Sequence, residues 1–261
     1  MRSIAIRRTA VAATVVSLAL LATACGGSDS ASDQGAGDKG AKGKDSAAAA
    51  PAVKALSAAE LGKVALAQGD VKGHKVSETA AKDTLPVDKI KTEKEVCSPL
   101  VRALMGSQVG DPAAFTKRTA VSEPKKSDPA KQDAKDTLKA MLDITTTQLA
   151  LGSYDGKGAQ ESLGSLRTAA TDCAGGFEFT ADGGKQKVTE IVEEQVKGGE
   201  EAAAWTVEVE QDGEKMRFKL AAIRQDTVFV SFSSMNLGMV GSGEDFDLPV
   251  AVVEAQSEKL A

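Results

Sequence analysis

The sequence predicts an α+β fold: a single domain in which helices pack against an antiparallel sheet and one disulfide crosslinks the chain. Two stretches carry this prediction. Residues 205–220 alternate apolar and polar side chains on both sides of Asp212-Gly213, which is the pattern of a β-hairpin with a tight turn. Residues 157–173 instead place apolar side chains three and four positions apart, which is the period of a helix with one apolar face.

Two short helices are expected before the sheet. The first begins at Ser57, because Ser57 and Glu60 have the spacing of a capping box. The second covers residues 98–105 and carries Pro99 in its first turn, where proline is favoured.

The longest predicted helix covers residues 157–172 and stops before the glycine pair at 175 and 176. One stripe along it is apolar and consists of Ala159, Leu163, Leu166, Ala170 and Cys173. This stripe is expected to face inward. A last helix is predicted over residues 248–260.

The other strands are predicted on both sides of the long helix. Residues 144–154 precede it, and residues 228–232 follow the hairpin as a further strand. Residues 187–196 fit a strand or a helix by period, and the strands that follow favour a strand. Within the hairpin, Glu208 and Glu210 are expected to lie across from a basic row. These exposed pairs would each contribute a few tenths of a kcal/mol.

The first 24 residues have the order of a secretion signal. Arg2, Arg7 and Arg8 come first, an apolar run over residues 10–21 follows, and small residues end the region. The apolar run is shorter than the roughly 20 residues that cross a bilayer, so a permanent membrane helix is the weaker interpretation. Both the general secretory and the twin-arginine export routes stay open.

The stretch LATAC at residues 21–25, followed by GGS, resembles the lipobox of bacterial lipoproteins, with Ala22 where that family prefers Leu. The resemblance implies that the chain is cut before Cys25 and that the Cys25 thiol carries a diacylglycerol. Two or more acyl chains, such as palmitate, hold a protein stably in a bilayer at about 0.8 kcal/mol per buried CH₂. The alternative is an ordinary signal peptide whose cleavage site adjoins a cysteine.

The chain after Cys25 begins with a predicted flexible linker. Residues 26–53 contain no aromatic residue, no Leu and no Ile, and cannot bury enough apolar surface to fold. As a random coil they would span about 30 Å. The expected parts are therefore a signal peptide (1–24), a lipidated cysteine with its linker (25–53) and an extracellular domain (54–261). The expected location is the outer face of the cell membrane, through the lipid anchor.

The charge of the chain bears on its partners. The formal net charge is −5, and it becomes −8 once residues 1–24, with three Arg and no acid, are removed. An acidic protein without a dense Lys/Arg patch does not suit nucleic acid. The expected partners are the membrane, through the anchor, and an extracellular ligand or envelope protein.

Cys97 and Cys173 are the two cysteines left after Cys25. An exported protein folds in an oxidising compartment, so these two are predicted to form a disulfide. Closing this loop of about 77 residues would stabilise the fold by about 4.5 kcal/mol in the chain-entropy model. The alternatives are two buried free thiols or a redox pair, and no C-x-x-C spacing supports the second.

Residues with catalytic potential are scarce. The sequence has no G-x-S-x-G elbow, no Walker loop and no G-x-G-x-x-G after a strand, so neither an enzyme nor a cofactor is predicted. His74 is the only histidine and has no partner for a zinc site. Glu244, Asp245 and Asp247 lack the spacing of a calcium loop, so no metal site is predicted.

Two aromatic residues are candidates for a ligand site. Trp205 alternates with valines and is expected in the core. Tyr154, at a strand end beside Asp155-Gly156, is the candidate for a site edge, with packing in the turn as the alternative.

Two longer stretches carry a resemblance to a known family. The stretch ALSAAELGKVALAQGDVKGHKV (55–76) reads as a helix leading into a short strand, and LALGSYDGKGAQESLGSLRTAATDCAGGF (149–177) as a strand and a helix closing on Cys and an aromatic. With the strand-rich tail, this is similar to the PknH-like extracellular sensor domain of actinobacterial receptor kinases and related lipoproteins. That family's domain usually carries more cysteines. The resemblance implies an α+β domain with a cleft for an extracellular ligand and without catalysis.

These observations leave more than one function class open. The first hypothesis is a membrane-anchored ligand-binding or sensor domain. The alternatives are a carrier of an apolar, lipid-like ligand and a structural or interaction protein of the envelope. A large apolar cavity would favour the carrier, and a filled core with a polar cleft would favour sensing.

Overall fold

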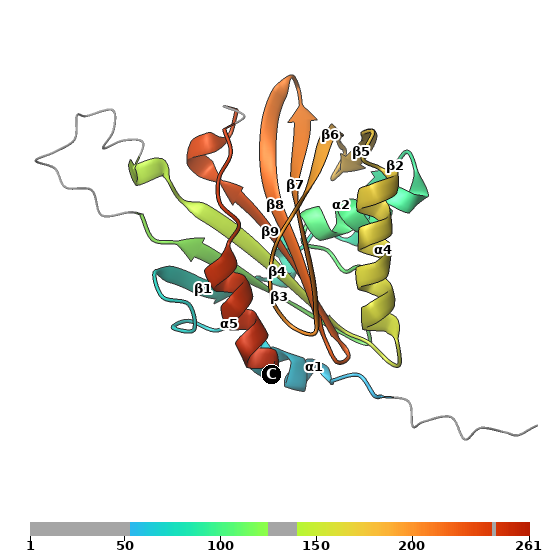
Figure 1. The fold of residues 1–261 in the computed structure, drawn as a ribbon, viewed down its shortest axis with the longest axis vertical. Helices are drawn as coiled ribbons and strands as arrows, with labels where there is room; N and C mark the ends of the chain where they lie inside the picture. The colour runs from blue at the N-terminus through green and yellow to red at the C-terminus, as the bar shows by residue number, and fades with distance from the viewer. Residues whose placement is uncertain (1–52, 125–139, 242–243) are drawn as a thin grey trace, which may run out of the picture. The chain divides into compact units, whose positions relative to one another are not determined.

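The structure is a computed structural model that describes residues 53–124, 140–241 and 244–261. The predicted signal peptide, Cys25 and the linker up to residue 52 lie outside these residues. Within them, nine strands form one antiparallel sheet in the order β1-β3-β4-β9-β8-β7-β6-β5-β2 (Figure 1). The strands are β1 (His74–Glu78), β2 (Ile90–Thr92), β3 (Ala114–Ser122), β4 (Thr145–Ser153), β5 (Phe177–Ala181), β6 (Gly184–Glu194), β7 (Glu201–Gln211), β8 (Glu214–Gln225) and β9 (Val228–Asn236).

Helices cover both faces of this sheet. Their bounds are α1 (Ala58–Val64), α2 (Ser98–Leu104), α4 (Gly158–Asp172) and α5 (Val250–Leu260). Helices α2 and α4 pack on one face, and α1 and α5 pack on the other (Figure 1). The predicted α+β class is therefore confirmed. None of the helices in the described ranges is long and apolar enough to cross a bilayer.

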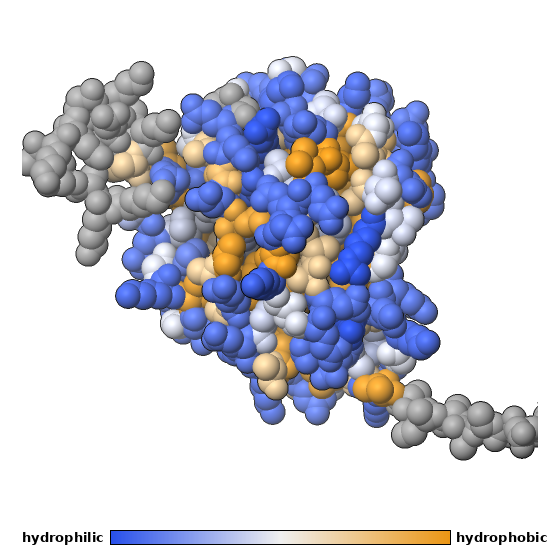
Figure 2. Space-filling view, in the orientation of Figure 1, coloured by the Kyte–Doolittle hydropathy of each residue, from blue (hydrophilic) through white to orange (hydrophobic). Residues whose placement is uncertain are grey.

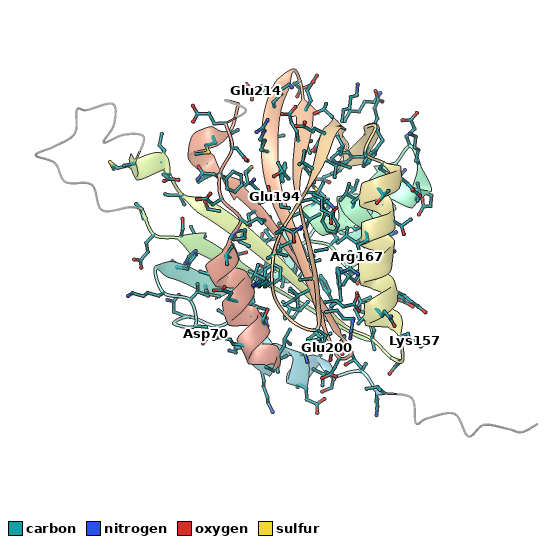
Figure 3. All side chains as sticks on the ribbon, viewed as in Figure 1. Asp70, Lys157, Arg167, Glu194, Glu200 and Glu214 are labelled. Carbon is teal, nitrogen blue, oxygen red and sulfur yellow. A yellow bond between two sulfur atoms is a disulfide. The ribbon has the colours of Figure 1, made fainter. Side chains whose placement is uncertain are left out.

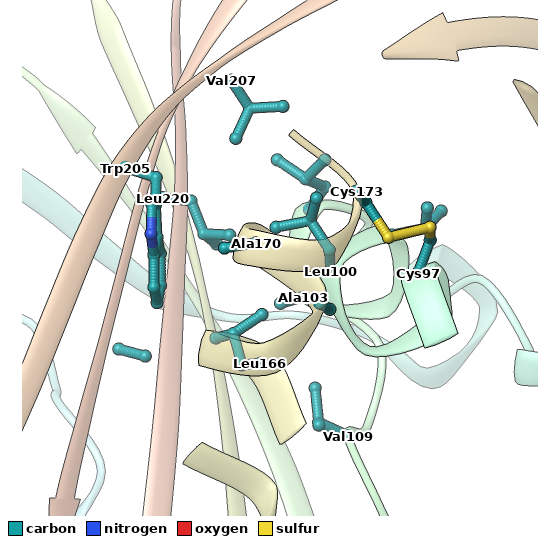
Figure 4. Packing of buried hydrophobic residues seen from close by; sticks show 14 of the residues in the cluster. Cys97, Leu100, Ala103, Val109, Leu166, Ala170, Cys173, Trp205, Val207 and Leu220 are labelled. Carbon is teal, nitrogen blue, oxygen red and sulfur yellow. A yellow bond between two sulfur atoms is a disulfide. The ribbon is translucent and has the colours of Figure 1, made fainter. Parts of the chain in front are cut away.

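The core between the sheet and α2 and α4 contains the predicted apolar faces. Trp205 and Leu220 of the central hairpin pack toward Leu166 of α4 and Leu100 of α2 (Figure 4). The five residues of the predicted helix stripe are all buried. The apolar residues of the strands and of the helices therefore pack in one core, as the strand alternation and the helical period predicted.

The predicted disulfide joins Cys97, directly before α2, to Cys173, directly after α4 (Figure 4). The two Cα atoms lie 5.9 Å apart, within the usual range for a disulfide. Both cysteines are buried. The crosslink fixes the ends of the two helices that cover this face.

The second core lies under α1 and α5, and a buried glutamine links these two helices. Gln256 of α5 donates from Nε2 to the carbonyl of Val64 at 2.8 Å and accepts from the amide of Leu66 at 3.1 Å. These backbone groups belong to the end of α1, where a helix leaves carbonyls without an internal partner. Gln256 thus satisfies them inside an apolar core.

Local signals set the helix starts and the hairpin. The capping box of α1 is present: Glu60 N donates to Ser57 Oγ, and Ser57 N donates to the Glu60 carboxylate at 2.9 Å. In the turn between β7 and β8, Asp212 and Gly213 have φ of 54° and 83°, as a two-residue hairpin turn requires. The ambiguous stretch at 187–196 lies largely in strand β6, which confirms the strand.

Three strands lack a signal in the sequence and were not predicted. β3 carries Lys117 and Arg118 next to each other and only three fully buried positions, so its alternation is weak. Arg118 donates to the carbonyls of Leu66 and Gly62 near the end of α1, which gives a charged residue a role inside a strand. β5 and β2 are short, with five and three residues, and depend on pairing with β6 and with each other.

Candidate functional site

A charged cluster lies on the sheet face that α5 covers. Lys219 of β8 donates from Nζ to Glu194 Oε1 at 2.6 Å and to Thr206 Oγ1 at 2.8 Å. Asp245, from the chain before α5, lies 2.9 Å from the same Nζ. The side chain of Lys219 is only 3% exposed. We call these four residues the Lys219 cluster.

Strand register brings the cluster together. Thr206 of β7 lies directly opposite Lys219 of β8, and Val192 of β6 lies opposite Thr206. Glu194 is two residues further along β6, on the same face as Val192, and reaches diagonally to Lys219. Thr206 also donates its hydroxyl hydrogen to Glu194 Oε1. In Figure 3, Glu194 lies near the middle of the sheet, beside the chain that leads into α5.

A second group of charges continues the same face. Glu208 of β7 accepts from Lys215 at 2.7 Å, from Thr189 at 3.0 Å and from Arg217 at 3.4 Å. The hydrogen bond from Lys215 lowers the pKa of Glu208, and burial opposes this effect less strongly. Glu208 is buried, so the expectation that the hairpin's charged pairs are exposed was wrong for this residue. The opposite charges do pair across the strands as predicted.

Residues 245–248, which we call the strap, lie over the Lys219 cluster and lead into α5. The ring of Phe246 lies 5.9 Å from Lys219 Nζ, within the range of a cation–π contact. Burial raises the pKa of Asp245, but the hydrogen bond and the charge of Lys219 together outweigh it, so this pKa lies below its ordinary value. The strap is thus attached to the sheet through a charge pair and an aromatic ring.

Two hollows flank the strap. The larger has a volume of about 440 Å³ and lies between the strap, the first turn of α5 and the ends of several strands. Its polar side chains include His74, Glu123, Asp143, Asn236 and Asp247. We call it the acidic hollow, because the described residues that line it include four carboxylates and no Lys or Arg. Asn236 donates to Asp143 at 2.8 Å, which holds one of these carboxylates in place.

The smaller hollow lies on the other side of the strap. It has a volume of about 350 Å³ and is lined by Glu194, Lys219 and the strap. Asp245 and Asp247 line both hollows. A displacement of the strap would therefore change the shape of both and uncover the Lys219 ammonium.

The chemistry of this site suits binding. The acidic hollow offers carboxylate and amide oxygens as hydrogen-bond acceptors, together with the apolar surface of Met239, Leu248 and Val250. In the residues that the structure describes, no group of three or more His, Cys, Asp or Glu is placed to hold a metal ion. Among the described residues of the lining, the excess of negative charge favours a positively charged group as the occupant.

The sequence-predicted site residues fall in different places. Tyr154 is 3% exposed, and its hydroxyl donates to the carbonyl of Val109, so it packs in the core and lines neither hollow. Burial raises the pKa of Tyr154 to about 12. His74, to which the sequence assigns no site, lines the acidic hollow, with Nδ1 3.1 Å from the carbonyl of Lys72. Cys25 lies outside the described residues.

The residues that form the site could not be identified from sequence. Lys219 stands in a strand whose alternating charged residues are typical of an exposed face. Its burial depends on the strap, which comes later in the chain, after strand β9. The one available signal is the acidic run at 244–247, whose spacing does not indicate a metal site.

Comparison with known proteins gives a fold likeness. No family model matches the chain, and no curated protein matches it. Among solved structures, the extracellular domain of PknH from Mycobacterium tuberculosis matches with a TM-score of 0.48 and 10% identity, over 79% of this chain and 97% of that one. The chain is similar to the PknH extracellular domain. An uncharacterised protein from Mycobacterium smegmatis, an Rv0999 ortholog, matches with a TM-score of 0.33 and 12% identity, over 72% and 90% of the two chains.

Both matches concern the fold alone, and a shared fold does not establish a shared function. The function is therefore argued from this chain's own residues.

Proposed function

We propose that this chain is a lipoprotein, anchored through Cys25 to the outer face of the cell membrane, whose folded domain binds an extracellular ligand without catalysis. The observation that carries the proposal is the acidic hollow beside a strap that is attached to a buried lysine. A hollow of about 440 Å³ is large enough for a small molecule or a few side chains.

The strap supports a sensing role. The Asp245 side chain is 54% exposed, and an ion pair of this exposure contributes at most about 1 kcal/mol. A ligand that prefers a shifted strap by a similar free energy would move it. Because the strap leads into α5, which packs on the sheet and on α1, its displacement reaches a surface away from the hollow.

The filled cores count against the alternative of a lipid carrier. Trp205 and Phe229 on one face of the sheet and Phe232 on the other are each 4% exposed or less. A carrier needs an apolar cavity of lipid size, whereas the acidic hollow is rich in carboxylates. A polar hollow above filled cores favours the ligand-binding or sensor domain over the carrier.

A non-catalytic role is consistent with the groups that line the acidic hollow. Among the described residues, its lining contains one imidazole, His74, the hydroxyl groups of Ser122 and Thr145, and no cysteine, lysine or tyrosine. His74 Nδ1 lies 3.1 Å from the carbonyl of Lys72, and neither hydroxyl is its hydrogen-bond partner. A nucleophile paired with a base is the usual minimum for covalent catalysis. The residues of the hollow therefore support binding, and turnover of an envelope substrate that a substitution in the hollow abolishes would contradict the proposal.

The ligand can be sought by native mass spectrometry of the protein purified from its own host. Ala251 is exposed and lines the acidic hollow, so Ala251→Trp fills part of it without disturbing a core. Ala59→Trp adds the same bulk on exposed α1 as a control. We expect an additional mass on the wild type and on Ala59→Trp, and its loss from Ala251→Trp. A mass that Ala251→Trp retains would place the ligand elsewhere.

The anchor has its own test. Cys25→Ser removes the thiol that the lipobox resemblance assigns to acylation. We expect the wild-type protein in the membrane fraction, with its mass increased by the acyl chains, and Cys25→Ser outside that fraction. A mature wild-type protein with an unmodified Cys25 would rule out the lipid anchor.

A further inference from the structure

Exposed apolar side chains gather beside the acidic hollow. They are Met141, Leu142, Leu237, Val240 and Val250, each between 42% and 60% exposed. We call them the apolar rim. Figure 2 shows apolar surface among polar surface on the face that carries α5. Large apolar side chains that gather beside polar ones, rather than stand singly, mark interaction sites.

Backbone contacts place the rim at the hollow. Leu237 N donates to the carbonyl of Ile144 at 2.9 Å, and Ile144 N donates to that of Leu142 at 2.7 Å, so the two stretches lie side by side. The neighbours of these leucines, Asp143 and Asn236, line the hollow. Val250 lines the hollow itself, at the start of α5. The other rim residues lie within two positions along the chain of residues that line it.

The charges of the hollow select the occupant. Glu123 and Asp247 are exposed carboxylates, and the part of the lining that the structure describes contains no Lys or Arg. Lys219, the buried cation under the strap, already contacts Glu194 and Asp245. The surface thus repels an anionic membrane or a nucleic acid and attracts positive charge. The exposed side chains of the apolar rim, in addition, favour a partner that presents apolar groups to cover them.

We propose that the acidic hollow and the apolar rim form a docking surface for a basic, amphipathic segment of a partner protein. Lys or Arg side chains of that segment enter the hollow, and its apolar side chains cover the rim. This inference rests on the proposed binding function and names the class of its partner. The carboxylates orient the partner segment and increase its rate of association, and the apolar contacts contribute most of the affinity.

The test measures dissociation constants of the full-length chain with synthetic peptides. The first peptide combines Lys and Leu, the second replaces Leu by Ser, and the third replaces Lys by Glu. We expect the Lys/Leu peptide to bind at least tenfold more tightly than either of the others. Raising the salt concentration should weaken that binding, because it depends on exposed charges.

Matched variants locate the binding. Glu123→Gln with Asp247→Asn removes two carboxylates from the hollow, and Leu237→Ser with Val240→Ser removes part of the rim. The control, Glu161→Gln with Asp172→Asn, removes two exposed carboxylates from α4 on the opposite face. Each of the first two pairs should weaken binding of the Lys/Leu peptide about tenfold, and the control should leave it unchanged.

Three outcomes would overturn the docking surface. If the control pair weakens binding of the Lys/Leu peptide as much as the other pairs do, the peptide is attracted by the net charge of the protein. Unchanged binding after the rim substitutions, or equal binding of the Lys/Ser peptide, would show a simple cation site. If Ala251→Trp releases a host ligand while no basic peptide binds, the proposed function stands and this inference falls.

Discussion

Lys219 is the residue on which the site depends most. Its ammonium group contacts Glu194, Thr206 and Asp245 within 2.9 Å, and its side chain is almost fully buried. A buried charge is stable only where its partners compensate the loss of water. Asp245 of the strap is therefore one of the partners that compensate the buried charge of Lys219, and Lys219 is the residue to which the strap is attached.

We predict that Lys219→Met destabilises the fold by about 2 kcal/mol, since it leaves the Glu194 carboxylate without its cation in a largely buried place. Asp245→Asn should cost less than about 1 kcal/mol, because Asp245 is half exposed. Urea unfolding of the three proteins measures the differences.

Lys215→Met is the matched control for this prediction. Lys215 lies on the same strand and also pairs with a glutamate, but its side chain is 54% exposed. Lys215→Met should therefore lower the free energy of unfolding much less than Lys219→Met does. Equal losses at the two positions would show that burial of Lys219 does not matter.

At the residue scale, the sequence predicts residues whose role follows from their type and compartment. Cys97 and Cys173 pair as expected because no other thiol of the domain is available. Lys219 shows the opposite. It stands in a strand whose alternating charges indicate a surface, and a distant segment buries it. Burial depends on the whole set of neighbours, which a local pattern does not contain.

At the scale of elements, the disulfide connects the two helices of one face. Cys97 precedes α2 and Cys173 follows α4, and the side chains of both helices fill the core beside them (Figure 4). The crosslink spans a sequence separation of 76 residues that includes β3, β4 and both helices. It therefore restricts a large part of the unfolded chain.

We predict that Cys97→Ala with Cys173→Ala lowers the free energy of unfolding by about 4 kcal/mol in the chain-entropy model. Urea unfolding of this variant and of the wild type, each with and without reductant, measures the effect. Reductant should destabilise the wild type and leave the double variant unchanged. A wild type that is insensitive to reductant after full reduction would contradict the prediction.

Strong elements were predictable and weak ones were not. α4 and the hairpin of β7 and β8 repeat their periods over many residues. The structure has α4 within one residue of the expected bounds, and the hairpin has the expected turn but extends to residues 201 and 225. β2, β3 and β5 are short or charged, and each forms because a neighbouring strand supplies hydrogen-bond partners. Such strands are decided by tertiary context rather than by propensity.

At the scale of the whole molecule, charge pairs connect distant parts of the chain. Arg224 of β8 contacts Glu200 and Glu201, and Glu201 also accepts from Arg167 of α4 at 2.9 Å. Hydrogen bonds from Arg224 and then from Arg167 lower the pKa of Glu201 below its ordinary value of 4.5. Figure 3 shows Arg167 on α4, with Glu200 near the lower end of the sheet.

We predict that the protein loses stability as the pH falls below about 4.5. The pKa values of Glu201 and Glu208 in the folded protein lie below their ordinary value of 4.5. The unfolded chain therefore takes up protons first as the pH falls, which favours unfolding. Stability should be constant from pH 7 to about pH 5 and then decline through the lower pKa values of the folded state.

Urea midpoints at a series of pH values check this prediction. Arg224→Gln removes the largest cause of the lowered Glu201 pKa, so its stability should decline less steeply below pH 4.5. A stability that rises on acidification would require carboxylates with raised pKa values and would contradict the assignment.

The sequence by itself determined the helices, the hairpin strands, the α+β class and the disulfide, because periodicity, turn residues and a count of cysteines are local or compositional properties. Only the tertiary structure decided that β8 buries a lysine under the strap, that two hollows flank the strap, and that an apolar rim borders the acidic one. These features arise where segments far apart in the chain pack together. Such long-range contacts leave no periodic pattern in the sequence.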